Sequence, residues 1–403
     1  MTKHKYKNYF YFSSFIALLF FIPIFNNSNL GSDWDSYALI GTYRNYMEYN
    51  LYIPSRPPGF PIYEFLIGIF ILISENLSLS QEQVILIFQF ISLISFNYLI
   101  YLFFNKIENN NFIVYLIATL SPIYLISGLS VIDYFFGSLF GFTAFYIHMY
   151  KQKTKLLNIF IVIALTISIS TRLSNVIFLV VLVAYEYFKN KNIRNTLIIF
   201  TATFLASSVI YLIFYSNLFS FYKSAGIYQS WSDMLCIFNL TNTDHDLLGR
   251  VGRFVLKQIP YLGTIGSILL VINIFNFKFD IKNKNFYFLL IFIFFELSFL
   301  RLPTEEGHLL PAFVAFMILL GQNKNKALLV ILIFTFLSNF YNINFYEVDE
   351  MDSANEIYFS FNLANGYFIE DLATRNEIAI KKDFHYKNSQ ISLNKAWING
   401  CPN

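Results

Sequence analysis

Residues 84–104 read Val-Ile-Leu-Ile-Phe-Gln-Phe-Ile-Ser-Leu-Ile-Ser-Phe-Asn-Tyr-Leu-Ile-Tyr-Leu-Phe-Phe, without one charged side chain. An α-helix needs about 20 mainly apolar residues to cross the hydrocarbon core of a bilayer. A strand of a membrane β-barrel would alternate apolar and polar residues, and this stretch does not. The stretch therefore predicts a helix that spans a membrane.

Similar apolar runs, filled by Phe, Ile and Leu, recur along the 403 residues. We expect membrane-spanning helices at 9–25, 84–104, 112–128, 133–150, 156–170, 173–188, 196–215, 255–276, 285–300, 308–321 and 326–343. Hydrophobic residues make up 56% of the chain and charged residues 13%, whereas about 25% of a soluble domain is charged. The predicted fold class is an all-α polytopic membrane protein with about eleven transmembrane helices.

Composition and missing motifs exclude several other classes. The net charge of +3 is too small for a nucleic-acid-binding protein, so no nucleic acid partner is expected. Two cysteines, Cys236 and Cys401, do not make a disulfide-stapled scaffold. The sequence has no Walker motif and no glycine-rich phosphate loop, so an ATP-driven pump is not expected.

The charges between the apolar runs predict the orientation of the chain. Lys3, Lys5 and Lys7 precede the first run, which has no small-residue cleavage site, so we interpret this run as a retained anchor. Residues 62–75 are apolar but short and contain Glu64, which fits a re-entrant or interfacial segment. If 62–75 does not cross, more than half of the 28 Lys and Arg residues are cytoplasmic, as the positive-inside rule requires. We therefore expect a multi-pass plasma (inner) membrane protein with an outer C-terminus.

With this topology, ionisable residues gather at the outer face, and Glu296 is the main exception inside a span. The outer-face residues are Asp33, Asp35, Arg44, Glu48, Arg56, Asp133, Arg172, Asp233, Asp244, His245, Asp246, Arg250, Arg253, Arg301, Glu305, Glu306 and His308. Charged groups at a membrane are costly, so they indicate a functional site by default. For each single residue, a merely solvated loop stays as the alternative interpretation.

The first outer loop, Gly31-Ser32-Asp33-Trp34-Asp35-Ser36-Tyr37-Ala38, is the most informative stretch. Apolar residues at helical spacing follow it, which predicts a short helix on the membrane surface that starts near the two acids. One carboxylate can cap this helix, but both cannot fill that role. The other is a candidate general base or cation ligand.

A proline-rich turn and two further outer motifs follow. Ser55-Arg56-Pro57-Pro58-Gly59-Phe60-Pro61 predicts a rigid turn that redirects the chain, with Arg56 available to an anion. Ser121-Pro122, Ser127 and Ser130 precede Asp133 at the start of an apolar run. Glu305-Glu306-Gly307-His308-Leu309-Leu310-Pro311-Ala312 leads from an outer loop into a span.

These motifs, in this order and on one side of the membrane, resemble the GT-C superfamily of integral-membrane glycosyltransferases. The most similar types are the protein O-mannosyltransferases and aminoarabinose transferases, and the resemblance covers roughly residues 1–320. It implies a GT-C-like bundle with outer-face juxtamembrane helices. It also implies a sugar donor on a polyprenyl phosphate, membrane lipid as surroundings, and a glycan, lipid or protein acceptor. We therefore expect a cell-envelope transferase that moves a hexose or pentose to an acceptor hydroxyl.

The resemblance also implies roles for individual residues. Asp35 matches the first-loop acid and is the expected general base. Arg172, in the outer hairpin Thr171-Arg172-Leu173-Ser174-Asn175, is the first candidate to stabilise the departing phosphate, although a snorkelling charge is its alternative. The further candidates are Asp133 and Asp33 as catalytic acids, and Arg56, Arg301, Glu306 and His308 as substrate-binding residues. Asp133 fits the N-cap of its span equally well. Ser36 stands where relatives with an Asp-Glu pair carry the second acid, so a divalent metal cofactor stays open.

The remaining segments and the competing functions complete the expectations. We expect a GT-C-like transmembrane domain at 1–343 and a small extracytoplasmic cap of mixed structure at 344–403. The outer loop 216–254, with its Asp244-His245-Asp246 run, is interpreted as an acceptor-binding loop. The rival function is a secondary transporter or flippase, which would need a site near the bilayer midplane and paired repeats. A third alternative, an O-antigen polymerase or ligase, would need a large Arg-rich outer loop.

Overall fold

A computed structural model of the chain describes residues 7–33, 35–50, 52, 55, 59–107, 111–151, 154–190, 193–224, 247–274, 285–301, 306–344, 347–349, 356–358 and 361–382. Most of these residues are helical, as the apolar runs predict. The N-terminal half contains α1 (Lys7–Asn26), α2 (Asp35–Tyr49), α3 (Pro61–Ser74), α4 (Gln81–Phe104), α5 (Phe112–Leu120), α6 (Pro122–Leu129), α7 (Asp133–Tyr150), α8 (Lys155–Thr171), η1 (Leu173–Asn175), α9 (Val176–Tyr185), the π-helix η2 (Glu186–Asn190) and α10 (Ile193–Ser224).

The C-terminal half adds further helices and four short strands. They are α12 (Leu247–Gln258), η3 (Ile259–Leu262), α13 (Thr264–Ile274), α14 (Asn285–Arg301), η4 (Glu306–Leu309), α15 (Leu310–Leu320), α16 (Ala327–Leu337), β1 (Tyr341–Asn344), β2 (Glu347–Asp349), β3 (Glu356–Tyr358), β4 (Asn362–Asn365) and α17 (Tyr367–Ile380). Strands β1 and β4 form one antiparallel pair, and β2 and β3 form another.

Three of the described helices are both long and apolar enough to cross a membrane: α1, α4 and the Arg194–Phe214 part of α10. Helices α5 and α6 meet at an angle of 50° and would add a fourth crossing as one broken span. The bend lies at Ser121-Pro122, where proline lacks the N–H that would continue α5. Long apolar helices of this kind are typical of a membrane protein.

Besides the bent run 112–128, two further expected spans are interrupted or shorter in the structure. The run 255–276 is not one helix: α12 ends at Gln258, η3 contains Pro260, and α13 starts only at Thr264. Proline cannot donate to the helical ladder, which explains the interruption. The run 326–343 is helical only as far as Leu337, because the chain then turns and enters strand β1, which pairs with β4.

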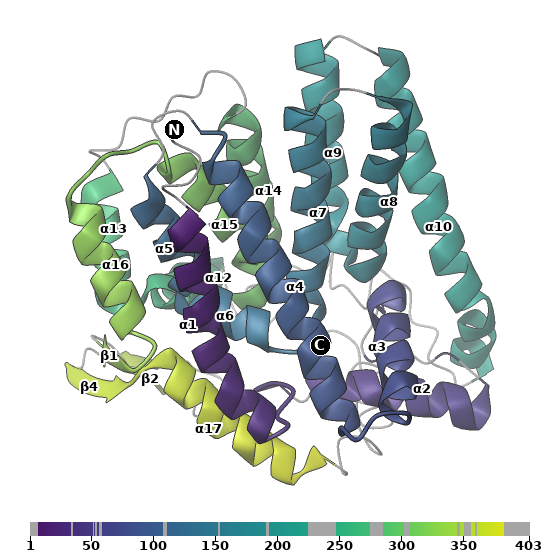
Figure 1. Cartoon of the computed structure of the whole chain (residues 1–403), viewed down its shortest axis with the longest axis horizontal. Coiled ribbons are helices and arrows are strands. Elements are labelled where there is room, and N and C mark those ends of the chain that lie inside the picture. Colours follow the sequence, from purple (N-terminus) through teal and green to yellow (C-terminus); the bar gives the residue numbers. More distant parts are fainter. Residues whose placement is uncertain are drawn as a thin grey trace.

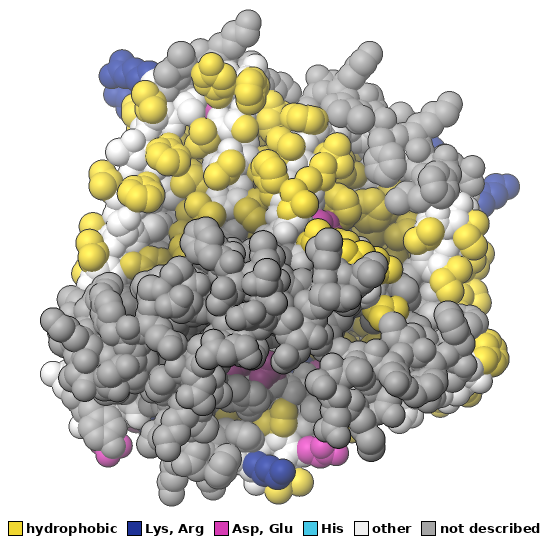
Figure 2. All heavy atoms as spheres, turned by 180° about the vertical axis from the view of Figure 1, so that it is seen from behind, with side chains coloured by type: hydrophobic (Ala, Val, Ile, Leu, Met, Phe, Trp, Pro, Cys, Tyr) yellow, Lys and Arg dark blue, Asp and Glu magenta, His cyan; other side chains and the backbone are white. Residues whose placement is uncertain are grey.

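Most helices run lengthwise through the bundle, whereas α17 lies at the lower left of its lower end in Figure 1 and α2 and α3 lie at the lower right of the same end. We call this the α17 end. Helix α1 begins at the opposite end, where the α7–α8 and α9–α10 connections also lie (Figure 1). Seen from behind, most of the visible Lys and Arg side chains lie near that opposite end, above a surface rich in hydrophobic side chains (Figure 2).

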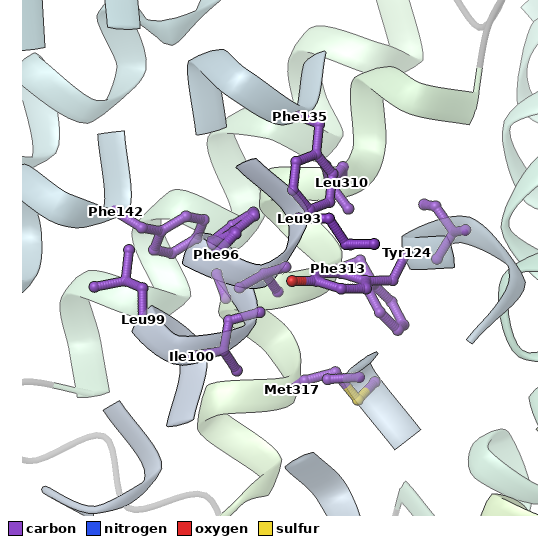
Figure 3. Close-up of a cluster of buried hydrophobic side chains, with 14 of the residues drawn as sticks. Leu93, Phe96, Leu99, Ile100, Tyr124, Phe135, Phe142, Leu310, Phe313 and Met317 are labelled. Atoms are coloured by element: carbon purple, nitrogen blue, oxygen red, sulfur yellow. The ribbon is translucent and has the colours of Figure 1, made fainter. Parts of the chain in front are cut away.

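The centre of the bundle is a single apolar core. Figure 3 shows side chains from α4, α6, α7 and α15 meeting there, among them Phe96, Tyr124, Phe135 and Phe313. The Phe96 and Phe135 rings meet edge to face with centroids 5.0 Å apart. This packing holds the N-terminus of α7 in place, and the candidate site begins at that terminus.

Helix α3 lies at the α17 end and packs against α2 and α4. Its Glu64 carboxylate is buried and accepts hydrogen bonds from the Tyr52 hydroxyl, from the Ser55 N–H at 2.6 Å and from the Phe60 N–H at 3.1 Å. This carboxylate therefore folds the turn that precedes α3 back onto the helix. Glu64, the acid that made the interpretation of 62–75 ambiguous, therefore has a structural role in this turn.

The C-terminal segment packs directly against the helical body. The Asn342 side-chain amide donates to the Thr264 hydroxyl at 3.1 Å, which joins β1 to the start of α13. The Phe368 ring of α17 meets Phe20 of α1 edge to face, with centroids 4.3 Å apart. Helix α17 is therefore fixed across the α17 end of the bundle.

Candidate functional site

Asp133 stands at the first residue of α7, and its side chain is buried with 1% exposed. Ile132, not Asp133, occupies the N-cap position, so the carboxylate is not used as a helix cap. Asp133 Oδ1 has no hydrogen-bond partner among the described residues.

Arg172 comes to Asp133 from the far end of α8, where it is the residue that ends the helix. Its Nη1 donates to Asp133 Oδ2 at 2.6 Å, and its Nε donates to the Ser174 hydroxyl at 3.1 Å. The Arg172 side chain is largely buried, with 9% of the residue exposed. A snorkelling arginine would extend its charge into water, so burial beside Asp133 argues against that alternative.

His308 and Tyr134 complete this cluster. The Arg172 Nη2 lies 2.5 Å from His308 Nδ1 and 2.8 Å from His308 Nε2. Because arginine can only donate, the ring nitrogen that it contacts must accept, which requires a neutral imidazole. The Tyr134 ring lies under the guanidinium, 3.8 Å from its carbon, and 4.9 Å from the His308 ring centroid. An aromatic face stabilises a cation in this position.

Gly307 allows the histidine to come this close. A Cβ atom on Gly307 would lie 2.3 Å from Cδ2 of the Tyr134 ring, a distance that no real contact tolerates. The glycine in η4 therefore lets the chain before α15 pass directly over Tyr134. We call Asp133, Tyr134, Arg172, Gly307 and His308 the central cluster.

The central cluster combines groups with complementary chemistry. A guanidinium can bind two oxygens of a phosphate or carboxylate in parallel. A neutral imidazole beside it can accept a proton near neutral pH and can donate a hydrogen bond through its N–H. Burial strengthens these interactions because little water competes for them. The arrangement is suited to binding an anion at the end of the helix bundle and assisting its departure.

The first outer loop lies at the start of α2, and its two acids have different roles. The Asp33 carboxylate accepts a hydrogen bond from the Asp35 N–H at 3.0 Å, which fixes the turn before the helix. Asp33 thus takes the capping role that the sequence allowed to one acid only. Asp35 is 7% exposed and is the first residue of α2.

The first loop is tied to the chain that leads into Asp133. The Val131 N–H donates to the Leu30 carbonyl at 2.8 Å. The Leu30 N–H in turn donates to the Tyr37 hydroxyl at 3.3 Å. Burial raises the pKa of the Tyr37 phenol, so it stays protonated at neutral pH. The segments that carry Asp35 and Asp133 therefore lie side by side.

Several predicted site residues lie outside the described part of the chain. They are Arg56, the side chains of Arg301 and Glu306, and most of the loop 216–254 with its Asp244-His245-Asp246 run. Among the residues that the structure does describe, no group of three or more His, Cys, Asp or Glu side chains could hold a metal ion. The central cluster contains one carboxylate and one imidazole beside a guanidinium, which is not a metal-binding set.

An apolar cavity of about 510 Å³ begins beside the central cluster. Leu309, the neighbour of His308, lines it, and so does Gln322 beyond the other end of α15. At 1.5 Å per helical residue, these two positions are roughly 20 Å apart. Most other lining residues, from α12, α13 and α14, are apolar, but Glu296 faces the cavity and accepts a hydrogen bond from the Gln258 amide at 2.6 Å.

Sequence reasoning found Asp133, Arg172 and His308 but missed Tyr134 and Gly307 as partners. Both follow or precede a selected residue directly, yet an aromatic residue beside an acid is ordinary in a chain with 20% aromatic residues. Only the spatial contact of η4 with α7 shows why a glycine and a tyrosine are needed.

Comparison of the chain with protein-family models, with curated proteins and with solved structures gives no match.

Proposed function

We propose that this protein is a membrane glycosyltransferase of the GT-C type, which moves a sugar from a polyprenyl-phosphate donor to an acceptor hydroxyl at the outer membrane face. The observation that carries the proposal is the contact of Arg172 with both Asp133 and His308. These residues come from three separate outer motifs, and two of those motifs resemble the superfamily. Their convergence in one buried cluster is the arrangement that a shared active site requires.

The proposal includes the finer architecture. About eleven helical segments cross the membrane, and α2 and α3 lie on its outer surface, which is the α17 end. The Lys-rich opposite end then faces the cytoplasm, in agreement with the positive-inside rule. The small unit at the C-terminus, with β1 to β4 and α17, is extracytoplasmic.

In the proposed reaction, an acceptor oxygen forms a bond to the anomeric carbon while the bond from that carbon to the donor phosphate breaks. The electron pair leaves with the polyprenyl phosphate, and the acceptor proton goes to Asp35. Arg172 faces the departing phosphate and stabilises the charge that develops on it. Such preorganised charge is commonly the largest contribution to catalysis.

The partners of Arg172 keep the guanidinium in position. Asp133 holds Nη1 and Ser174 holds Nε, so two of the three guanidinium nitrogens are fixed by protein contacts. The neutral His308 ring beside Nη2 can donate a hydrogen bond from its N–H to a phosphate oxygen on which charge develops. Because the cluster is buried, the donor phosphate replaces water there and meets a preformed site.

The apolar cavity supplies a place for the lipid part of the donor. It starts at Leu309, next to His308, and extends along α15 for a distance close to that of a bilayer leaflet. An isoprenoid tail in this cavity would place its phosphate near Arg172. The cavity thus joins a lipid-binding path to a charged site, as a lipid-linked donor requires.

The test uses purified protein in lipid nanodiscs with undecaprenyl-phosphate-linked sugars that carry a radiolabel. Asp35→Asn and Asp133→Asn are expected to abolish release of the labelled sugar from the lipid at a temperature where both variants are still folded, although Asp133→Asn should unfold at a lower temperature than the wild type. Arg172→Gln is expected to weaken binding of undecaprenyl phosphate itself. Matched controls are Glu75→Gln, an exposed acid after α3, and Arg194→Gln, an exposed arginine at the opposite end. Full turnover in Asp35→Asn would remove its assignment as the base.

A secondary transporter or flippase is kept as a second candidate because of Glu296. A carboxylate that faces a cavity between helices is typical of transport pathways. For this function, Glu296→Gln should stop movement of a fluorescent polyprenyl-phosphate analogue across proteoliposomes, whereas Asp35→Asn should not. The opposite pattern, with sugar release lost only in Asp35→Asn, supports the transferase.

A further inference from the structure

Arg375 is the largest fully buried side chain of the described residues, with 0% exposed. It lies in α17, and its Nε donates to Asp371 Oδ2 at 2.6 Å, one helical turn earlier. A buried guanidinium is costly unless every side of it is bound. The remaining donors of Arg375 show what the residue binds.

These donors reach two different loops of the helical body. Nη1 donates to the Leu129 carbonyl at 3.1 Å and lies 3.4 Å from the Asn29 carbonyl, while Nη2 donates to the Ser130 hydroxyl at 2.6 Å. Asn29 belongs to the loop that leads into α2, and Ser130 to the loop that leads into α7. A backbone bond from the Val131 N–H to the Leu30 carbonyl also joins the two loops directly.

Each of these loops carries an acid of the candidate site a few residues further on. The first loop leads to Asp35, and the second leads to Asp133. One guanidinium therefore binds the chain upstream of both carboxylates. Planar, forked donors suit this task, since lysine could offer only a single point of attachment.

Helix α17 is itself held firmly enough to serve as a fixed support. Besides the Phe368–Phe20 contact, the Asn29 amide donates to Asn376 Oδ1 at 2.5 Å. Lys382 at the end of the helix pairs with Glu82 at the start of α4 at 3.2 Å. These contacts surround Arg375 on both sides along the helix.

We propose that Arg375 is a positioning residue, which clamps the loops before α2 and α7 together and so sets the spacing of Asp35 and Asp133. The clamp gives the C-terminal segment a role in the site although it contributes no group to the central cluster. That the spacing matters for sugar transfer rests on the function proposed above. The clamp itself does not, and it can be tested without any substrate.

The first test is hydrogen exchange measured by mass spectrometry on the full chain in nanodiscs. Arg375→Met removes the clamp and is expected to speed amide exchange about tenfold in segments 28–33 and 129–133, since bonds to a charged group are each worth roughly that factor. The Val131 amide is the most direct reporter. Exchange at the wild-type rate in both segments would overturn the proposal.

Two milder variants guard against misfolding of Arg375→Met. Ser130→Ala removes one acceptor of the clamp without leaving an empty space, and it should speed exchange mainly in 129–133. Arg375→Lys keeps the charge beside Asp371 but cannot reach both loops, so it should not restore slow exchange.

Lys382→Met is the matched control, because it frees the same helix from α4 without touching either loop. If amide exchange in both loops is as fast in this control as in Arg375→Met, then the packing of α17, not Arg375, holds the loops.

The second test separates positioning from binding. With the labelled donor, Arg375→Met is expected to lower kcat about tenfold or more while the affinity for undecaprenyl phosphate stays unchanged, because Arg172 and the cavity are intact. If kcat is unchanged although amide exchange in both loops is faster, the positioning role is overturned. If the wild-type protein releases no sugar from any donor, the proposed function fails, and the exchange result still decides whether the clamp exists.

Discussion

The Arg172 guanidinium and the Asp133 carboxylate lie 2.6 Å apart in a buried ion pair, although 39 positions separate them in the sequence. Helices α7 and α8 form a hairpin, so the end of α8 returns to the level at which α7 begins. At 1.5 Å per residue, each of these helices is on the order of 25 Å long. The pair therefore closes the hairpin at the end opposite its connecting loop.

Removing one member of this pair should destabilise the protein strongly. Asp133→Asn leaves the Arg172 charge buried without its carboxylate, which in buried pairs costs about 3–5 kcal/mol. We expect a clear fall in the unfolding temperature of the detergent-solubilised protein, measured by loss of the monodisperse fraction on heating.

The double variant Asp133→Asn/Arg172→Met provides the control for this prediction. Removing both charges should cost less than the sum of the single changes, because neither partner is left alone. Glu75→Gln, at an exposed position, should leave the unfolding temperature unchanged. Strictly additive losses would mean that the two side chains do not interact.

Gly307→Ala should disrupt the central cluster without altering any of its charges. The new methyl group would meet the Tyr134 ring at 2.3 Å, so the ring must leave its place beside Arg172 and His308. Overpacking of this kind costs about 1–3 kcal/mol. We expect a moderate loss of stability and a much larger loss of sugar release from the labelled donor.

Gly252→Ala is the matched control, since a Cβ atom there has nothing within 4 Å. This change should be neutral or slightly stabilising. The double variant Gly307→Ala/Tyr134→Ala removes the clash, so its stability should recover in part. Its activity should stay low, because the Tyr134 ring under the Arg172 guanidinium is missing. Wild-type activity in Gly307→Ala would show that the close approach of η4 to Tyr134 is not needed.

Cysteine labelling should distinguish the two ends of the bundle. A cysteine at Ser78, between α3 and α4 at the α17 end, should react from outside the cell with a membrane-impermeant maleimide. A cysteine at Lys155, exposed at the start of α8 at the opposite end, should react only after the membrane is permeabilised. A background with Cys236→Ser and Cys401→Ser removes the native thiols. Labelling of the Lys155 position from outside would reverse the orientation.

Much of this arrangement could be predicted from the sequence because hydrophobic runs and charge placement are local signals. The run 84–104 lies within α4, and the acid at the start of the run 133–150 lies at the start of α7. Asp133 and Arg172, the members of the buried ion pair, both lie at the predicted outer end of their apolar runs, so the charge pattern indicated both of them. Local patterns fix which end of a helix a residue occupies, and this already limits which residues can meet.

Other features depend on contacts between distant segments and left no local signal. In the sequence, Arg375 is one of several charged residues in a mixed tail. Its burial and its contacts become visible only when α17 packs on loops more than two hundred positions away. Glu64 made its segment ambiguous, yet the carboxylate is buried by the turn that it organises. The interruption at Pro260 could have been predicted, since proline inside an apolar run is a known break.

The apolar cavity gives a last prediction, which concerns the lipid part of the donor. Leu270 of α13 lines the cavity, and Ile272, two residues later, is 62% exposed on another face of the same helix. Leu270→Trp should fill the space and weaken binding of undecaprenyl phosphate about tenfold or more, whereas Ile272→Trp adds the same side chain outside and should not. Binding is measured by native mass spectrometry from nanodiscs. A short-chain isoprenyl phosphate, which does not need the full length of the cavity, should bind both variants equally. If Leu270→Trp weakens the short ligand as much as the long one, the tail lies elsewhere and the cavity has no part in holding the donor.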